Sequence, residues 1–266
     1  MARFRADYTM VARSGIVPRM NSTERLIANL WEPTKVRQMA HQFADVAADE
    51  LVGRAFVVRR PGSSKRAGAL IRARRGAMSP VALARRVQRE SLHLSHPRFL
   101  AQQVAAPIPA AALVESVVAA MNQSLAVWEM SPIATAIDRD LITRFKKLFH
   151  YRMSSEGSLV PGGAIANLTA LLAARDALER DAHRIGRTRV AIITGEQTHY
   201  SVTRAAKILG FGSDAVFRVD PDRRFRTDPA AVKSSLAKAK KAGFRKFVVV
   251  GSAGSTPTGS FDDLSA

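Results

Sequence analysis

The chain has 266 residues, of which 47% are hydrophobic, so it can form a packed core and is not broadly disordered. Its 41 Lys and Arg residues outnumber 22 Asp and Glu residues, giving a formal charge of +19. This charge favours phosphate-rich partners, although a solvated, Arg-rich surface is the simpler explanation. Because there are no cysteines, disulfides, thiolate nucleophiles and Cys-ligated metals are excluded, and we predict no metal site.

Targeting signals are not evident in the sequence. Residues 1–20 are basic but lack the apolar core of a secretory signal. The most apolar long stretch, residues 104–121, is broken by Pro107, Pro109 and Glu115 and is not expected to span a bilayer. Together with the absence of cysteine, these features predict a cytoplasmic protein.

Residues 1–94 are predicted to form a basic, mostly helical N-terminal segment. Within it, the apolar spacing of residues 22–51 favours two helices separated at Pro33. Residues 53–78 are basic, rich in Gly and Ser and only weakly periodic, which indicates a linker or a basic arm. No aromatic residues alternate with its cations, so the linker is the preferred interpretation.

Residues 95–150 are predicted to form a second, helical entry segment. Ser-Pro pairs at 79–80 and 131–132 mark two helix starts, because Ser caps a helix and Pro suits its first turn. Between them, we expect residues 96–109 to be extended and residues 109–130 to form one largely apolar helix.

The pattern changes in residues 151–266, where predicted helices and strands alternate. Such alternation is typical of an α/β sheet with mostly parallel strands and right-handed crossovers. The expected elements are a helix at 165–184, a strand at 189–194, a helix at 200–209, a strand at 215–219, a helix at 229–242 and a strand at 246–250.

The first candidate site residues are Gly162 and Gly163, directly before the predicted helix at 165–184. Glycines let the backbone approach a ligand closely, and the first amides of a helix attract phosphate. A simple turn gives the same local pattern, so this signal is weak when it stands alone.

Two further candidates follow the carboxyl ends of predicted strands. His199 follows the strand at 189–194, where an imidazole can stack on a flat ligand or move protons, although a structural histidine is common there. Residues 251–260 form a loop rich in Gly, Ser and Thr after the strand at 246–250. We interpret Asp262 and Asp263, beyond it, as the cap and first turn of another helix.

These stretches, in this order, resemble the group II pyridoxal-phosphate-dependent amino-acid decarboxylases, the aromatic-L-amino-acid and glutamate decarboxylase type. The likeness spans residues 95–265 and is faint before them. The sequences that carry it are PGGAIAN (161–167), AAR (173–175), THYSVTRAAKILG (198–210), GSTPTGSFDDL (254–264), and upstream SHPRF (95–99) and WEMSP (128–132).

The resemblance implies an N-terminal helical segment followed by the first part of an aspartate-aminotransferase-like large domain, with an incomplete sheet. It implies pyridoxal 5′-phosphate as cofactor, an amino-acid substrate and a homodimer. Gly162, Gly163 and Ala164 would bind the phosphate, and Thr256 would lie beside the cofactor. His199 would stack on the ring and take part in proton transfer.

Two departures from the family pattern affect these expectations. At Ala164 the family usually has a hydroxyl that binds the phosphate, and alanine has none. The family's Schiff-base lysine lies in a His-Lys dipeptide, which this sequence lacks, and an aspartate on the pyridine nitrogen precedes it. We therefore expect a truncated chain that is inactive by itself.

Two alternatives remain open. The same cofactor fold supports other reactions, such as carbon–carbon lysis of a phosphorylated amine, and the pocket around residues 128–132 would distinguish them. A basic protein that binds nucleic acid through residues 59–75 is the alternative from a different class, and it would show steeply salt-dependent binding.

Overall fold

The computed structural model describes residues 32–52, 78–94, 96, 99–100, 104–179, 189–212 and 214–265. The chain divides into two compact units, residues 1–123 and 124–266, which we describe separately. The basic run at 59–75, and with it nearly all of the predicted linker, lies outside the described residues, as does the first of the two helices predicted in 22–51. The domain boundaries at 94 and 150 stay predictions.

The helices described in the first unit each begin at a proline, whose fixed φ suits the first helical position. They are α3 (Pro33–Val52), α5 (Pro80–Glu90) and α6 (Pro109–Met121). The predicted cap of α5 is confirmed, because the Ser79 side chain accepts a hydrogen bond from the Ala82 amide at 3.2 Å.

Polar contacts join α3 to α5 and the residues that follow it. The Gln88 side-chain amide donates to the Val46 carbonyl at 2.9 Å. His93 is buried, and its Nδ1 lies 3.0 Å from a carboxylate oxygen of Glu50. These contacts hold the two helices together where the described residues offer few buried apolar side chains.

The helix predicted at 109–130 is shorter than expected. It ends at Met121, because Asn122 adopts a left-handed conformation with φ of 48° and caps the last turn. The next helical residues after α6 are those of η1, a 3₁₀ turn at Trp128–Met130. Among the described residues, no helix is both long and apolar enough to cross a membrane.

The second unit has the predicted alternation of helices and strands. Most bounds agree with the sequence expectation to within one or two residues, except that the first of the alternating helices ends at residue 178 rather than 184. The elements are α7 (Pro132–Leu148), α8 (Gly163–Leu178), β1 (Val190–Gly195), α9 (Ser201–Ile208), β2 (Val216–Val219), α10 (Pro229–Lys241) and β3 (Lys246–Val250).

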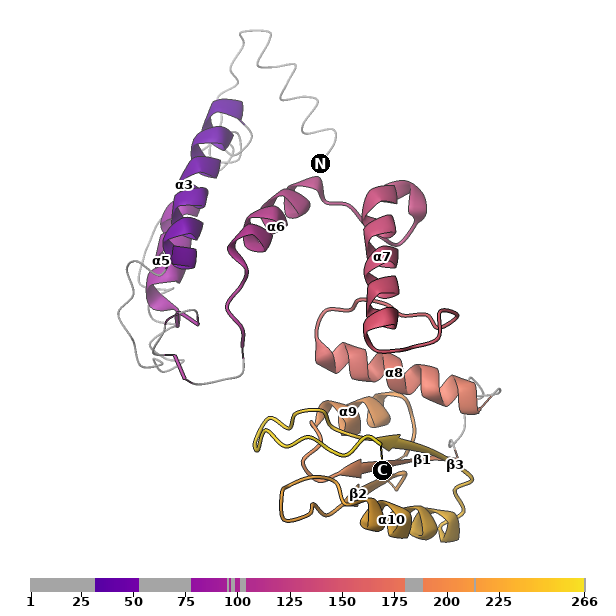
Figure 1. Ribbon diagram of the computed structural model, residues 1–266. Helices are drawn as coiled ribbons and strands as arrows, with labels where there is room; N and C mark the ends of the chain where they lie inside the picture. The colour runs from indigo at the N-terminus through magenta and orange to yellow at the C-terminus, as the bar shows by residue number, and fades with distance from the viewer. Residues whose placement is uncertain are drawn as a thin grey trace. The chain divides into compact units, whose positions relative to one another are not determined.

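The described strands form a parallel sheet in the order β2-β1-β3. Ile192 at the centre of β1 pairs with Val216 on one side and Val248 on the other. Figure 1 shows α10 on one face of the sheet and α9 on the other, with α8 beyond α9. Every residue of β1 is buried, so this strand is the centre of the core.

This arrangement confirms an α/β fold with an incomplete sheet. In the described part of the sheet, β2 and β3 each have an edge that no further strand pairs with. The carboxyl ends of the three strands point to one edge, as in all parallel sheets, and the loops of the candidate site follow them.

Candidate functional site

The N-terminus of α8 has the features of an anion site. Gly162 is the capping residue, with φ of 96° that favours glycine, and within the described chain no side chain caps the helix. A Cβ atom built on Gly162 or Gly163 would meet nothing within 4 Å, so the space above them is open. Ala164 follows, exposed, on the first turn. The first backbone amides of α8 are therefore accessible to a phosphate.

His199 lies in the loop between β1 and α9, at the carboxyl edge of the sheet. Its Nδ1 atom is 2.8 Å from Ser201 Oγ and 3.3 Å from the Ser201 backbone nitrogen. The Tyr200 ring lies on one side, with ring centroids 4.2 Å apart and planes inclined by 37°. The imidazole is exposed, so it can contact a ligand with the rest of its surface.

A hydrogen bond joins these two predicted parts of the site. Asn167, one turn into α8, donates from Nδ2 to Ser201 Oγ at 2.8 Å, and Ser201 in turn contacts His199. A second link, from the Arg175 guanidinium to the Leu209 carbonyl at 3.0 Å, holds α8 against the end of α9. The structure therefore places the helix of the Gly-Gly motif and the histidine on the same side of the sheet.

The loop after β3 is attached to the loop that carries His199. Thr198 Oγ1 lies 3.1 Å from Ser252 Oγ, with either hydroxyl able to donate. Ser255 is buried, and its hydroxyl has no hydrogen-bond partner among the described residues. Thr256 lies in the exposed turn that follows, and its place beside a cofactor stays a prediction.

Asp262 has a role that the sequence analysis did not find. The described residues 261–265 are too short a segment to test the interpretation of Asp262 and Asp263 as a helix cap and first turn, which stays a prediction. In the structure, the Asp262 carboxylate accepts hydrogen bonds from the Thr227 amide and hydroxyl at 2.7 and 2.8 Å, and from the Ser252 amide at 2.7 Å. It thereby joins the loop after β3 to the segment before α10.

Thr227 also explains why the last residue of β1 is a glycine. A Cβ atom on Gly195 would collide with the Thr227 hydroxyl oxygen, which Asp262 holds in place. The carboxyl end of β1 is thus covered closely by a side chain from another loop. Sequence reasoning did not find this cluster, because its members are spread along the chain.

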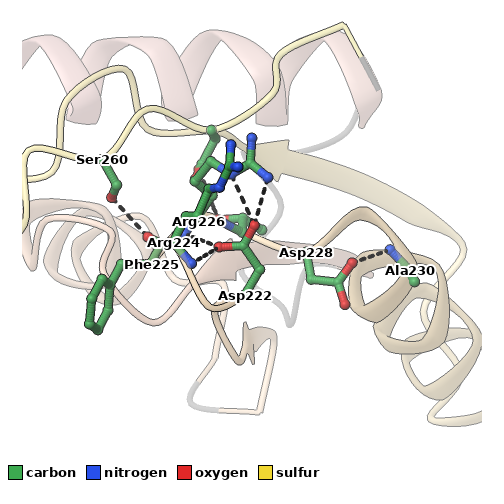
Figure 2. A network of polar contacts seen from close by, with 9 residues as sticks. Asp222, Arg224, Phe225, Arg226, Asp228, Ala230 and Ser260 are labelled. Carbon is green, nitrogen blue, oxygen red and sulfur yellow. Dashed lines mark hydrogen bonds and ion pairs between the residues drawn. The ribbon is translucent and has the colours of Figure 1, made fainter.

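The turn before α10 is held by a carboxylate of its own (Figure 2). Asp222 accepts hydrogen bonds from the Arg224 and Arg226 amides at 2.8 and 2.9 Å and pairs with the Arg226 guanidinium. These bonds, above all that from the Arg226 amide, hold the pKa of the Asp222 carboxyl below its ordinary value of 3.8. The Ser260 hydroxyl donates to the Phe225 carbonyl at 2.8 Å, so this turn also meets the loop after β3.

The comparisons with known proteins agree with this geometry. Residues 82–266 match the family model described as the pyridoxal-dependent decarboxylase conserved domain. The chain belongs to the pyridoxal-dependent decarboxylase family. It is 31% identical over 183 residues to the aromatic-L-amino-acid decarboxylase of Bacillus atrophaeus. It is 33% identical over 174 residues to the L-2,4-diaminobutyrate decarboxylase of Rhizobium meliloti.

These alignments cover 68% and 64% of the chain but 37% and 34% of those two relatives, so the chain spans about a third of their length. Among solved structures, mouse CSAD in its apo form has a TM-score of 0.79 at 24% identity. That match covers 88% of this chain and 52% of the mouse protein, and it shows the shared fold. The family predicted from the sequence is therefore confirmed.

The residues of the site fit the family's cofactor. Open amides at the start of α8 suit its phosphate, and an exposed imidazole on the same side of the sheet suits its flat ring. The buried Ser255 hydroxyl offers a further polar group, since an unpaired hydroxyl at depth is costly without a partner. Among the described residues, no group of three acidic, His or Cys side chains offers a metal site.

Proposed function

We propose that this chain supplies the phosphate-binding and ring-stacking part of a pyridoxal-phosphate-dependent amino-acid decarboxylase. The observation that carries the proposal is the contact series from Asn167 through Ser201 to His199, which links the phosphate-binding helix to the imidazole. Family membership supports the reaction class, amino-acid decarboxylation. No observation favours carbon–carbon lysis over it.

The amides of Gly163, Ala164 and Ile165 would hold the phosphate, assisted by the positive end of the α8 dipole. His199 would lie against the pyridine ring on the side away from Tyr200 and keep water from that face. Thr256 would contact the cofactor from the loop after β3. When bound, pyridoxal 5′-phosphate acts as an electron sink for bond cleavage at the substrate's α-carbon.

Ala164 gives the sharpest test of the phosphate site. A serine there would add a hydroxyl beside the phosphate, and a hydrogen bond to a charged group contributes about 1.5–3 kcal/mol, or roughly a 10- to 140-fold gain in affinity. The suitable probe is pyridoxamine 5′-phosphate, because its amine cannot condense with surface lysines. We expect Ala164→Ser to bind it at least about 10-fold more tightly than the original chain.

The matched control is Ala166→Ser, also exposed on α8, where the backbone amide already bonds to the Gly162 carbonyl. It should leave the affinity unchanged. Pyridoxamine without its phosphate should bind far more weakly than the ester in every variant. Equal affinity for both compounds, with no gain in Ala164→Ser, would overturn the proposed phosphate site.

The sequence contains no His-Lys dipeptide, so the family's covalent attachment of the cofactor has no match within these 266 residues. We infer that they hold the cofactor without decarboxylating amino acids. Release of carbon dioxide at an enzymatic rate by the purified 266-residue chain would contradict this inference. The homodimer and the cytoplasmic location predicted from the sequence remain part of the proposal.

A further inference from the structure

We propose that Ser201 and Asn167 are positioning residues that fix which nitrogen of His199 carries its proton. They would hold the neutral imidazole with Nδ1 unprotonated and the Nε2–H group directed away from α9. This inference rests on the proposed function for its consequence, because a fixed ring is useful where it stacks on the cofactor. Its core claim concerns the protein alone and is measurable without any ligand.

The backbone favours one direction for the hydrogen bond to Nδ1. The Ser201 amide points at Nδ1 from 3.3 Å, and a backbone N–H can only donate. A proton on Nδ1 would face this amide hydrogen, so the contact favours Nδ1 as an acceptor, although at 3.3 Å it is too long to fix the tautomer without the Ser201 hydroxyl. In a neutral imidazole the remaining nitrogen, Nε2, then carries the proton.

The side chains add a stronger bond in the same direction. Ser201 Oγ lies 2.8 Å from Nδ1 and receives a hydrogen bond of 2.8 Å from the Asn167 amide group. Because that amide occupies a lone pair of the hydroxyl oxygen, the Ser201 proton is available to Nδ1. Ser201 is 2% exposed, so water does not compete well for these bonds.

The same contacts fix the plane of the ring. Ser201 holds Nδ1 from one edge, and the Tyr200 ring lies 4.2 Å away at an inclination of 37°. The Arg204 guanidinium lies 4.7 Å from the centre of the Tyr200 ring and holds that ring in turn. His199 is therefore supported by its partners on α8 and α9 while its surface stays exposed for a ligand.

The test is the ¹⁵N chemical shift of each His199 ring nitrogen in the ligand-free chain, at about pH 8.5, where imidazole is neutral. A His199→Gln variant identifies the resonances. In the original chain we expect Nδ1 to resonate as an unprotonated acceptor and Nε2 as a protonated nitrogen. In Ser201→Ala both should move toward the averaged position of a mixed population, and in Ser201→Thr they should return.

Asn167→Asp makes the test directional. The carboxylate accepts a hydrogen bond from the Ser201 hydroxyl, whereas the Asn167 amide donates one to it. The Ser201 oxygen can then accept a hydrogen bond from Nδ1–H, so the population of the tautomer protonated on Nδ1 should rise. The control is Thr169→Ala on the same helix, because the Thr169 hydroxyl donates to the Ile165 carbonyl of that helix. It should leave the ring nitrogens unchanged.

Binding of pyridoxamine 5′-phosphate provides the second readout. Loss of one hydrogen bond that orients the ring should weaken binding by about 2- to 10-fold in Ser201→Ala. If the ring-nitrogen chemical shifts are the same in Ser201→Ala and Asn167→Asp as in the original chain, the inference is overturned, whether or not pyridoxamine 5′-phosphate binds. If the original chain shows the expected nitrogen shifts but binds no ligand, the proposed function fails and the proton assignment stands.

Discussion

Replacement of Asp262 by alanine tests how the loop after β3 is held. The Asp262 carboxylate oxygens accept hydrogen bonds from the Thr227 amide and hydroxyl and from the Ser252 amide, with donor–acceptor distances of 2.8 Å or less. The alanine variant leaves these donors without their acceptor. We expect the loop and the segment before α10 to separate more often from the rest of the second unit.

The magnitude follows from the bonds that are lost. Each hydrogen bond to a charged group contributes about 1.5–3 kcal/mol, but Asp262 is only half-buried and water replaces part of the loss. A net cost of about 2–3 kcal/mol for local opening is therefore expected. Asp262→Asn retains an acceptor oxygen and should cost about half as much.

Amide hydrogen exchange measures this opening directly, because the Thr227 and Ser252 amides are themselves the donors. In Asp262→Ala both should exchange about 30- to 140-fold faster. The matched control is Asp263→Asn, because the Asp263 carboxylate accepts its hydrogen bonds from the nearby Ser265. This variant should leave the exchange rates of the Thr227 and Ser252 amides unchanged. Unchanged exchange in Asp262→Ala, or the same acceleration in the control, would refute the reasoning.

Three further predictions address other parts of the fold. Gly195→Ala should lower the free energy of unfolding by about 1–3 kcal/mol in urea titrations, because its Cβ collides with the Thr227 hydroxyl. Because its pKa is lowered in the folded state, the ionised Asp222 stabilises its turn at pH values above the ordinary carboxyl pKa, and this stability is lost as the pH falls through the folded-state pKa. Asp222→Asn should remove this acid-dependent loss, which amide hydrogen exchange of the turn would measure. His93→Ala should separate α3 from α5 and leave Glu50 without this partner, which limited proteolysis would detect as faster cleavage of the first unit.

Much of the fold was predictable because its signals are local. Prolines mark the starts of α5, α7 and α10 in the sequence, and the structure confirms each start. β1 reads as a buried strand since its residues are nearly all apolar, and every one of them is buried. Alternating helices and strands then leave a parallel sheet as the simple solution.

The sequence prediction was incomplete in two places, for different reasons. Asn122 ends α6 by a left-handed conformation in the middle of a largely apolar stretch, without the Gly or Pro that usually marks such a point. Asp262 has the local pattern of a helix cap, but its partner Thr227 is 35 residues away. A pattern of neighbouring residues does not contain that information.

The candidate site was predictable in part for the same reason. The Gly-Gly motif and His199 were found from their places before a predicted helix and after a predicted strand, and the family resemblance then assigned them roles. Asn167 lies inside one of those motifs and Ser201 inside another, yet their contact across 34 residues becomes visible only when α8 and α9 pack together. Sequence reasoning thus located the groups expected to touch a ligand and missed those that orient them.

The position of Asp262 in the chain has a consequence for how the protein is made. Synthesis proceeds from the N-terminus, and segments that emerge early begin to fold first. Thr227, before α10, leaves the ribosome 35 residues ahead of its acceptor Asp262. On a nascent chain the Thr227 hydroxyl that lies against Gly195 is therefore not yet held in place, and the carboxyl end of β1 is covered less firmly until residue 262 has been made.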